Sequence, residues 1–145
     1  MWIDQRGSEV LECNECLRLL AVGAGGVGRV GLLDDAGQVV IEPFNYRVLD
    51  RDLLIQVGPG SILDAAGHEA ILAFEIDEVD AGRAQAWSVL VRGVATVLDD
   101  EARVRPARPA GALPVVAEPG TSFVLIRSGV LTGRRSSLRN TPAET

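Results

Sequence analysis

The sequence predicts a mainly β protein with few helices, folded as one small antiparallel barrel that is closed or half-closed. Short apolar runs of strand length follow one another along the chain, and turns rich in Gly, Pro and Asp separate them. Only two segments have the residue pattern of a helix. Helices and strands do not alternate, which disfavours a doubly wound parallel sheet.

The first helix is expected over Leu11–Val22, where leucines recur at helical spacing, and the glycines of residues 23–28 end it. A second, short helix is expected over Ile62–Ala66, with Ser61 as its N-cap and Gly67 at its end. The strands are expected at Arg29–Leu33, Gln38–Val48, Leu53–Val57, Ala70–Ile76, Ala86–Leu98 and Phe123–Leu131.

The connections follow from their turn-forming and charged residues. Asp34–Gly37 and Leu49–Asp52 are expected to be turns, and the acidic run Glu75–Asp80 is expected to be a solvated loop. Asp99–Arg105 fits a short helical turn, and the four prolines of residues 106–119 predict an irregular stretch.

The predicted domain organisation has three parts. An N-terminal extension covers residues 1–10, the barrel domain covers 11–133, and a polar tail covers 134–145. We expect the tail to fray from Arg134 onward because it is polar and lies at the end of the chain.

Composition limits the function. The chain has 145 residues, 47% of them apolar, which suits one domain with a hydrophobic core. Its net charge of -6 and pI of about 4.8 argue against nucleic acid as a partner. All 14 basic residues are Arg, so only Arg can supply a side-chain cation to a phosphate. No apolar run is long enough to cross a membrane and the first residues do not resemble a leader peptide, so a cytoplasmic protein is expected.

Three motifs have simple structural interpretations. Residues 23–28 match G-x-G-x-x-G, but a dinucleotide loop needs a strand before the glycines and a helix after them, and the order here is reversed. Cys13 and Cys16 lack the further ligands of a zinc site and the βαβ setting of a redox motif, so they are interpreted as ordinary thiols on one helix face. His68 is interpreted as a surface histidine at a helix end.

Asn45 and Trp87 each have two interpretations. The Asn45 amide carries donors and an acceptor at the end of an apolar strand, which suits the edge of a heterocycle. An Asn that satisfies its own turn backbone fits the sequence equally well. Trp87 begins the longest strand and fits either a ligand contact or the core.

Seven short segments, taken in order, resemble the pyridoxamine 5'-phosphate oxidase-like, FMN-binding split-barrel family, in its compact actinobacterial branch. They are ECLRLL at 15–20, GRVGLLDD at 28–35, PFNY at 43–46, GSILDAA at 60–66, FEID at 74–77, WSVLVRG at 87–93 and VLTGRR at 130–135. The resemblance covers about residues 11 to 135. It implies a six-stranded antiparallel Greek-key split barrel, a homodimer and two FMN sites at the dimer interface.

The resemblance also implies site residues. Beside the isoalloxazine ring it places Phe44, Asn45 and Tyr46 of one subunit with Trp87 and Ser88 of the partner subunit. At the phosphate it places Gln56, Val57, Ser61 and Ile62, and Arg134 or Arg135 of the partner subunit are further candidates.

The chain departs from the family pattern at the phosphate. Family members usually carry Arg and Thr at the positions of Gln56 and Val57, and Lys at the position of Ile62. Loss of two cationic contacts is expected to weaken FMN binding by about two to four powers of ten. The tail also lacks the Arg-x-His element of true pyridoxamine phosphate oxidases, so oxidation of vitamin B6 is not expected.

Three functions are therefore open. The first is a flavin-dependent oxidoreductase of unknown substrate. The second is a non-enzymatic split-barrel dimer that has lost FMN or holds another ligand as carrier or sensor. The third uses the deazaflavin F420, whose acidic tail suits a basic groove lined by Arg103, Arg105, Arg108, Arg134 and Arg135. No metal site is expected.

Overall fold

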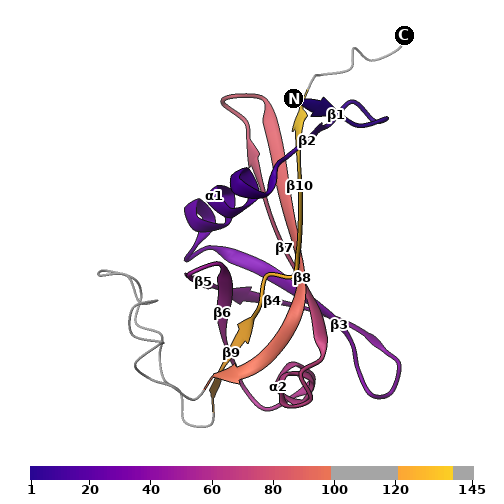
Figure 1. Ribbon diagram of the computed structural model, residues 1–145, viewed down its shortest axis with the longest axis vertical. Helices are drawn as coiled ribbons and strands as arrows, with labels where there is room; N and C mark the ends of the chain where they lie inside the picture. Colours follow the sequence, from indigo (N-terminus) through magenta and orange to yellow (C-terminus); the bar gives the residue numbers. More distant parts are fainter. Residues whose placement is uncertain (99–120, 139–145) are drawn as a thin grey trace.

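One long strand, β8 (Gln85–Leu98), belongs to two antiparallel sheets in this computed structural model, which describes residues 1–98 and 121–138 (Figure 1). The other strands are β1 (Trp2–Ile3), β2 (Glu9–Val10), β3 (Val27–Leu33), β4 (Val39–Asn45), β5 (Arg47–Leu49), β6 (Asp52–Val57), β7 (Ile71–Asp80), β9 (Ser122–Ile126) and β10 (Val130–Ser137). The helices are α1 (Cys13–Gly23) and α2 (Ser61–Gly67). The larger sheet has the order β1-β2-β10-β8-β7-β3-β4, and the smaller one joins β5, β6 and β9 to β8.

The two sheets separate where β8 passes Gly93. Residues up to Val94 pair with β7, whereas Ala95 to Leu98 pair with β9. A Cβ at Gly93 would lie 1.5 Å from the carbonyl oxygen of Arg127, so only glycine allows the two chain segments to approach this closely. The barrel is therefore split rather than closed, as the family resemblance implies.

The core lies between the inner face of the larger sheet, helix α1 and the smaller sheet. Alternate residues point inward and are buried from Leu72 to Ile76 of β7 and from Val89 to Ala95 of β8, as the two-residue period of a strand requires. Helix α1 contributes its buried side, formed by Cys16, Leu19 and Leu20. Helix α2 closes the opposite end with Ile62 and Ala66, and Figure 1 shows it beside the turn of the β3–β4 hairpin.

The strand count is ten rather than six. The strand expected over Gln38–Val48 breaks at Tyr46, and the strand expected over Phe123–Leu131 breaks at residues 127–129. At the second break, the N–H groups of Arg127 and Gly129 donate to carbonyls of β8 instead of continuing one straight strand. The short strands β1 and β2 add the remaining two, because the first residues pair with β10.

Three further expectations about local structure are wrong. The acidic run Glu75–Asp80 is strand, because Ile76 belongs to the core and the run pairs with β8. The tail does not fray at Arg134, since β10 continues to Ser137 against β8. The N-cap of α2 is Gly60, and Ser61 is the first helical residue without a side-chain capping bond.

The other expected elements are confirmed. Helix α1 matches the first predicted helix, and the turn at Asp34–Gly37 is closed by a bond from the Gly37 N–H to the Asp34 carbonyl. The predicted helical turn at Asp99–Arg105 and the proline-rich stretch fall outside the described residues. Within residues 1–98 and 121–138, neither helix has the length and apolar character needed to cross a bilayer.

Candidate functional site

The glycine-rich loop after α1 is bound to the end of β4. The Gly25 N–H donates to the carbonyl of Tyr46 at 2.9 Å. The Asn45 amide nitrogen, Nδ2, donates to the carbonyls of Gly25 at 3.1 Å and Gly26 at 3.3 Å. Because both partners are carbonyls, the amide can lie only one way round, with Nδ2 toward the loop. The exposed Asn45 side chain therefore offers its oxygen, Oδ1, as an acceptor.

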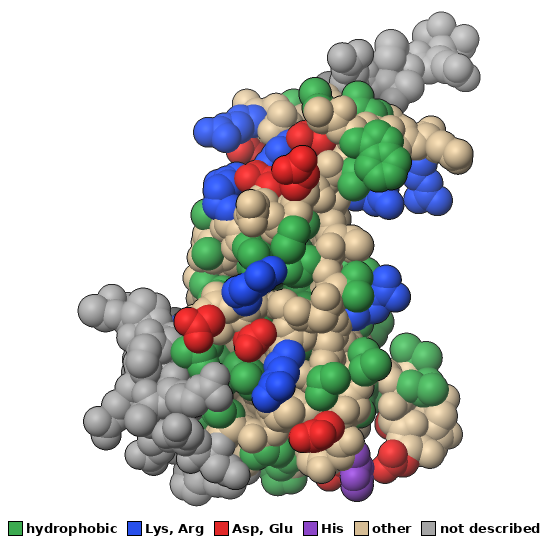
Figure 2. All heavy atoms as spheres, in the orientation of Figure 1, with side chains coloured by type: hydrophobic (Ala, Val, Ile, Leu, Met, Phe, Trp, Pro, Cys, Tyr) green, Lys and Arg blue, Asp and Glu red, His purple; other side chains and the backbone are tan. Residues whose placement is uncertain are grey.

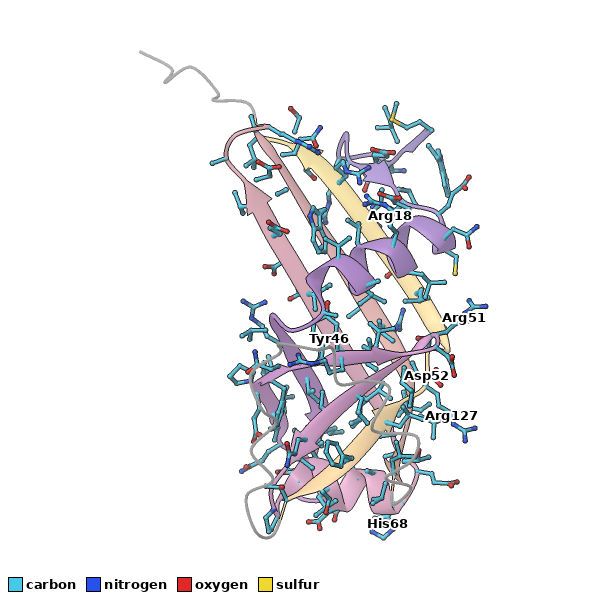
Figure 3. All side chains as sticks on the ribbon, turned by 90° about the vertical axis from the view of Figure 1, so that its left-hand side faces the viewer. Arg18, Tyr46, Arg51, Asp52, His68 and Arg127 are labelled. Carbon is cyan, nitrogen blue, oxygen red and sulfur yellow. The ribbon has the colours of Figure 1, made fainter. Side chains whose placement is uncertain are left out.

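Tyr46 supports this arrangement from inside the core. Its hydroxyl donates to the carbonyl of Leu20 at 2.7 Å, and its ring packs edge-on against Phe74 with centroids 5.1 Å apart. Tyr46 is only 1% exposed, and burial raises the pKa of its hydroxyl, which therefore stays a neutral donor. Figure 3 shows Tyr46 between α1 and the strands below it. In this conformation Tyr46 positions Asn45 rather than meeting a ligand.

Arg47 follows directly and is a residue that the sequence did not single out. Its Nη1 donates to the Tyr46 carbonyl at 3.0 Å, and a Cβ at Gly25 would lie 3.4 Å from the same nitrogen. Its Nε is buried without an acceptor, and Arg47 forms no ion pair with any described residue. A half-buried, unpaired cation thus lies beside Gly25, the residue whose carbonyl accepts from the Asn45 amide.

The outer face of the larger sheet is exposed and largely apolar. Strand registers place alternate residues of β3, β4, β7, β8 and β10 together on this face, away from the core. The exposed large apolar side chains of these strands all belong to it: Val27, Leu33, Val39, Ile41, Ile71, Val79, Val94 and Val130.

The predicted ring residues divide between the two faces of this sheet. Asn45, Ser88 and Arg134 lie on the outer face, with Ser88 opposite Arg134 in the pairing of β8 with β10. Phe44 and Trp87 lie on the inner face, where both are half-buried against the core. Strands β3 and β7 separate β8 from β4, so one chain does not bring Trp87 or Ser88 to Asn45.

The outer face also carries a proton-binding carboxyl group. Glu75 lies between Asp77 on its own strand and Arg29 on β3, with Nη1 of Arg29 3.6 Å from Glu75 Oε2 and 3.3 Å from Asp77 Oδ2. Burial, followed by the hydrogen bond and charge of Asp77, raises the pKa of Glu75 to about 7, and Arg29 opposes this only in part. Glu75 Oε1 is buried without a partner. Glu75 can therefore accept or release a proton near neutral pH.

The predicted phosphate residues are mostly buried or engaged. Val57 and Ile62 are each 3% exposed and belong to the core. The Gln56 amide donates to the hydroxyl of Thr121 at 2.6 Å. Only Ser61 faces an open surface, at the start of α2.

Ser61 lines a pocket of about 350 Å³ between the β3–β4 hairpin and α2. Figure 2 shows this pocket as a notch beside the single histidine, coloured purple, and His68 also lines it. The pocket is acidic, because Asp34, Asp35 and Asp64 contribute to its walls. Three carboxylates oppose the binding of a phosphate dianion there.

Asn45 and Ser61 are also far apart within one chain. Asn45 pairs with Val27 at the α1 end of the β3–β4 hairpin, whereas the pocket of Ser61 lies at the turn end. The six residue steps along β4 correspond to roughly 20 Å. In Figure 3, Tyr46 lies at mid-height and His68 at the foot of the molecule, which shows the same separation.

The remaining candidates have ordinary environments. Arg134 pairs with Asp4, and Arg135 pairs with Glu9 and Glu15, so neither cation is free. Hydrogen bonds from Arg18 and then from Arg135 lower the pKa of Glu15 to about 2. Arg103, Arg105 and Arg108 of the expected basic groove lie outside the described residues.

The interpretation of the cysteine pair is confirmed only in part, and that of His68 is confirmed. Both cysteines are free thiols, although Cys13 is exposed and Cys16 is buried, so they do not share one environment. His68 is exposed at the end of α2. Among the described residues, no three His, Cys, Asp or Glu side chains are grouped as metal ligands.

Comparison with known proteins identifies the family of this chain. Residues 12–139 match the family model described as pyridoxamine 5'-phosphate oxidase. The chain belongs to the pyridoxamine 5'-phosphate oxidase family. The chain is 33% identical over 107 residues to the uncharacterised protein Rv0080 of Mycobacterium tuberculosis, and this match covers 69% of the chain and 68% of that protein.

Two solved structures are similar over almost the whole fold. One is the FAD binding protein from Mycobacterium smegmatis, with 34% identity, a TM-score of 0.69, and coverage of 88% of this chain and 99% of that chain. The other is an FAD-binding protein from Mesorhizobium loti, with 26% identity, a TM-score of 0.71, and coverage of 90% and 99%. The family resemblance stated from the sequence is thus confirmed.

Proposed function

We propose that this protein is a flavin-binding homodimer that acts as an oxidoreductase on a small molecule other than a vitamin B6 phosphate. The two similar structures are FAD-binding proteins, and the sequence resembles FMN-binding members. A bound flavin would supply the electron transfer, while the protein binds and orients it. The proposal includes both FMN and FAD, and the mass spectrometry described below distinguishes them.

The observation that carries the proposal is the outer sheet face. Asn45 offers a fixed acceptor at one edge of a face whose exposed side chains are mainly apolar. Ligand sites commonly combine apolar walls with a few fixed polar groups. Exposed apolar patches of this kind are also typical of subunit interfaces. We propose that a second copy packs on this face and supplies its Ser88 beside Asn45, because one chain alone does not bring the two together.

The fit of a flavin differs between its two ends. The ring end fits, because Asn45 supplies an acceptor and neighbouring residues supply an apolar surface. The phosphate end does not fit the pocket of Ser61, which is lined by carboxylates. Ser61 stays a proposed phosphate contact of a site formed between subunits, in which the partner subunit's Arg134 exchanges its Asp4 partner for the phosphate.

The experiment is the absorbance spectrum of the purified protein, followed by mass spectrometry of whatever heat releases. We expect an oxidised-flavin spectrum, and a rise in melting temperature when FMN or FAD is added to protein stripped of ligand. If no chromophore is present and neither flavin raises the melting temperature, the proposal fails. The mass of the released compound distinguishes FMN from FAD.

The carboxylates around Ser61 and the missing cations at Gln56 and Ile62 favour a second candidate, a split-barrel dimer that has lost FMN or binds another ligand. It would act as a carrier or sensor, or would use F420. A melting temperature that rises with F420 and not with FMN or FAD would select the F420 version. A stoichiometric flavin spectrum would exclude the version with an empty site.

A further inference from the structure

Two polar side chains that differ in hydrogen-bonding character meet at Gly25. Asn45 contacts the Gly25 carbonyl through Nδ2, and Nη1 of Arg47 lies 3.4 Å from the position of a Cβ on the same residue. Both amide hydrogens of Asn45 are directed at carbonyls of the loop, so its side-chain oxygen is the group available to a ligand, as an acceptor. Arg47 can only donate, and its charge is unpaired among the described residues. The loop therefore holds an acceptor next to a cationic donor.

This pairing is fixed rather than adaptable. The Asn45 amide cannot turn over without placing its oxygen against two carbonyls. Gly25 has φ +91°, a conformation that favours glycine, and its N–H is bound to the Tyr46 carbonyl. The buried Tyr46 hydroxyl bonds to Leu20 and so holds the strand end against α1. A ligand at this position must supply a donor for Asn45 and an acceptor for Arg47.

We propose that Asn45 and Arg47 recognise the imide edge of a flavin's pyrimidine ring, Asn45 accepting from N3–H and Arg47 donating to the neighbouring C2 carbonyl and N1. This inference rests on the proposed function and deepens it. In oxidised flavin N3–H is the only N–H of the ring system, so an acceptor that cannot donate has one possible partner there. A cation at C2 and N1 also stabilises the negative charge that the ring gains on reduction.

The first test alters the ligand and leaves the protein intact. Protein stripped of ligand is titrated with FMN and with N3-methyl-FMN, and tryptophan or flavin fluorescence gives the two dissociation constants. We expect N3-methyl-FMN to bind the wild type about tenfold or more weakly, because it has lost the donor that Asn45 accepts. In Asn45→Ala the penalty for the methyl group should largely disappear. Equal affinity of the two flavins for the wild type, or the same penalty in Asn45→Ala, would overturn the role of Asn45.

The second test measures the flavin midpoint potential in Arg47→Met, which keeps an apolar stem of similar length. We expect a more negative potential than in the wild type, since the reduced ring loses its neighbouring cation. Arg127→Met is the matched control, because Arg127 is exposed at the break between β9 and β10 and forms no ion pair with a described residue (Figure 3). An unchanged potential in Arg47→Met, or an equal shift in Arg127→Met, would overturn the role of Arg47.

These outcomes are distinct from failure of the proposed function. If FMN and FAD both fail to bind the wild type, the flavin proposal fails, and the imide-edge inference fails with it. If flavin binds the wild type but the two tests give no difference, only the imide-edge inference fails. Melting temperatures of all variants without ligand show that each is folded before it is compared.

Discussion

The hydroxyl of Tyr46 donates to the carbonyl of Leu20 at 2.7 Å and so joins the end of β4 to the last turn of α1. The last four carbonyls of a helix have no partner within the helix, and Leu20 carries one of them. One buried bond thus completes the helix and fixes the strand end from which Asn45 reaches the glycine loop.

Removing this hydroxyl should destabilise the protein. In Tyr46→Phe the Leu20 carbonyl loses its side-chain partner in a buried position, which is expected to lower the free energy of unfolding by about 1–2 kcal/mol. Urea denaturation followed by circular dichroism measures the change. A variant as stable as the wild type would show that the bond contributes nothing.

Gly23 gives a second measure of the same contact. A Cβ at Gly23 would lie 2.6 Å from the Tyr46 hydroxyl oxygen, so Gly23→Ala should destabilise the wild type. The same substitution should cost clearly less in a Tyr46→Phe background, because the clashing oxygen is absent. Urea denaturation of the four proteins in this double-mutant cycle measures the coupling. A cost of Gly23→Ala that is equal in both backgrounds would contradict the contact.

Glu75 should make stability depend on pH. Its folded pKa of about 7 lies above the ordinary value of 4.5, so the folded state binds more protons between these values. The wild type should therefore lose stability as pH rises from 4.5 to 7, and Glu75→Gln should remove this loss. Since the side chain is 33% exposed, we expect a gain of about 1 kcal/mol at pH 8 and little at pH 4.

Urea denaturation at several pH values checks the Glu75 prediction. Glu78→Gln is the matched control, because Glu78 is exposed on the same strand and its side chain points to the other face. A gain that does not grow with pH, or that appears equally in Glu78→Gln, would argue against titration of Glu75.

Gly93 should tolerate no side chain. Its Cβ would lie 1.5 Å from the backbone oxygen of Arg127, so Gly93→Ala requires the two sheets to move apart and is expected to cost more than about 3 kcal/mol. Gly31→Ala is the comparison, because its Cβ would meet the Cβ of Ala73 at an ordinary 3.8 Å. Thermal unfolding of both variants decides the matter, and equal melting temperatures would contradict the prediction.

The outer sheet face should carry the proposed subunit interface. Ile41 is 69% exposed there, so Ile41→Glu should leave the folded subunit intact but weaken a dimer at least about tenfold, because a charge would be buried in an apolar contact. Val22→Glu is the control, since Val22 is similarly exposed on α1. Light scattering on a sizing column gives the mass of each. A wild type that is a monomer, or a dimer that survives Ile41→Glu, would rule out this face.

Much of the fold is predictable because its causes are local. Turn residues at Asp34–Gly37 and apolar alternation along Ala86–Leu98 specify a hairpin and a long strand without reference to the rest of the chain. The break at Tyr46 is different. A tyrosine inside an apolar run looks like a strand residue, and its contact with Leu20, 26 positions earlier, cannot be read from the local sequence.

The acidic run was wrongly predicted for a related reason. Glu75 and Asp77 point outward while Phe74 and Ile76 fill the core, so high charge and a strand are compatible when the residues alternate. Because four of the six residues from Glu75 to Asp80 carry a carboxylate, the sequence resembles a solvated loop more than a strand.

The candidate site was predictable only in part. The unusual position of Asn45 could be recognised from the sequence, and of its two interpretations the structure supports elements of both: the amide nitrogen satisfies nearby backbone while the oxygen stays available. Arg47 gave no signal, because an arginine after a strand is ordinarily a solvated side chain. Its importance depends on a buried Nε without an acceptor, which no sequence pattern reveals.

The sharing of β8 by both sheets has a consequence for how the molecule opens. The two sheets cannot separate unless the hydrogen bonds of their shared strand β8 break. Amide hydrogens on β7 and β9 should therefore exchange with solvent through one common opening event. The split barrel then behaves as a single cooperative unit, despite having two sheets that face different directions.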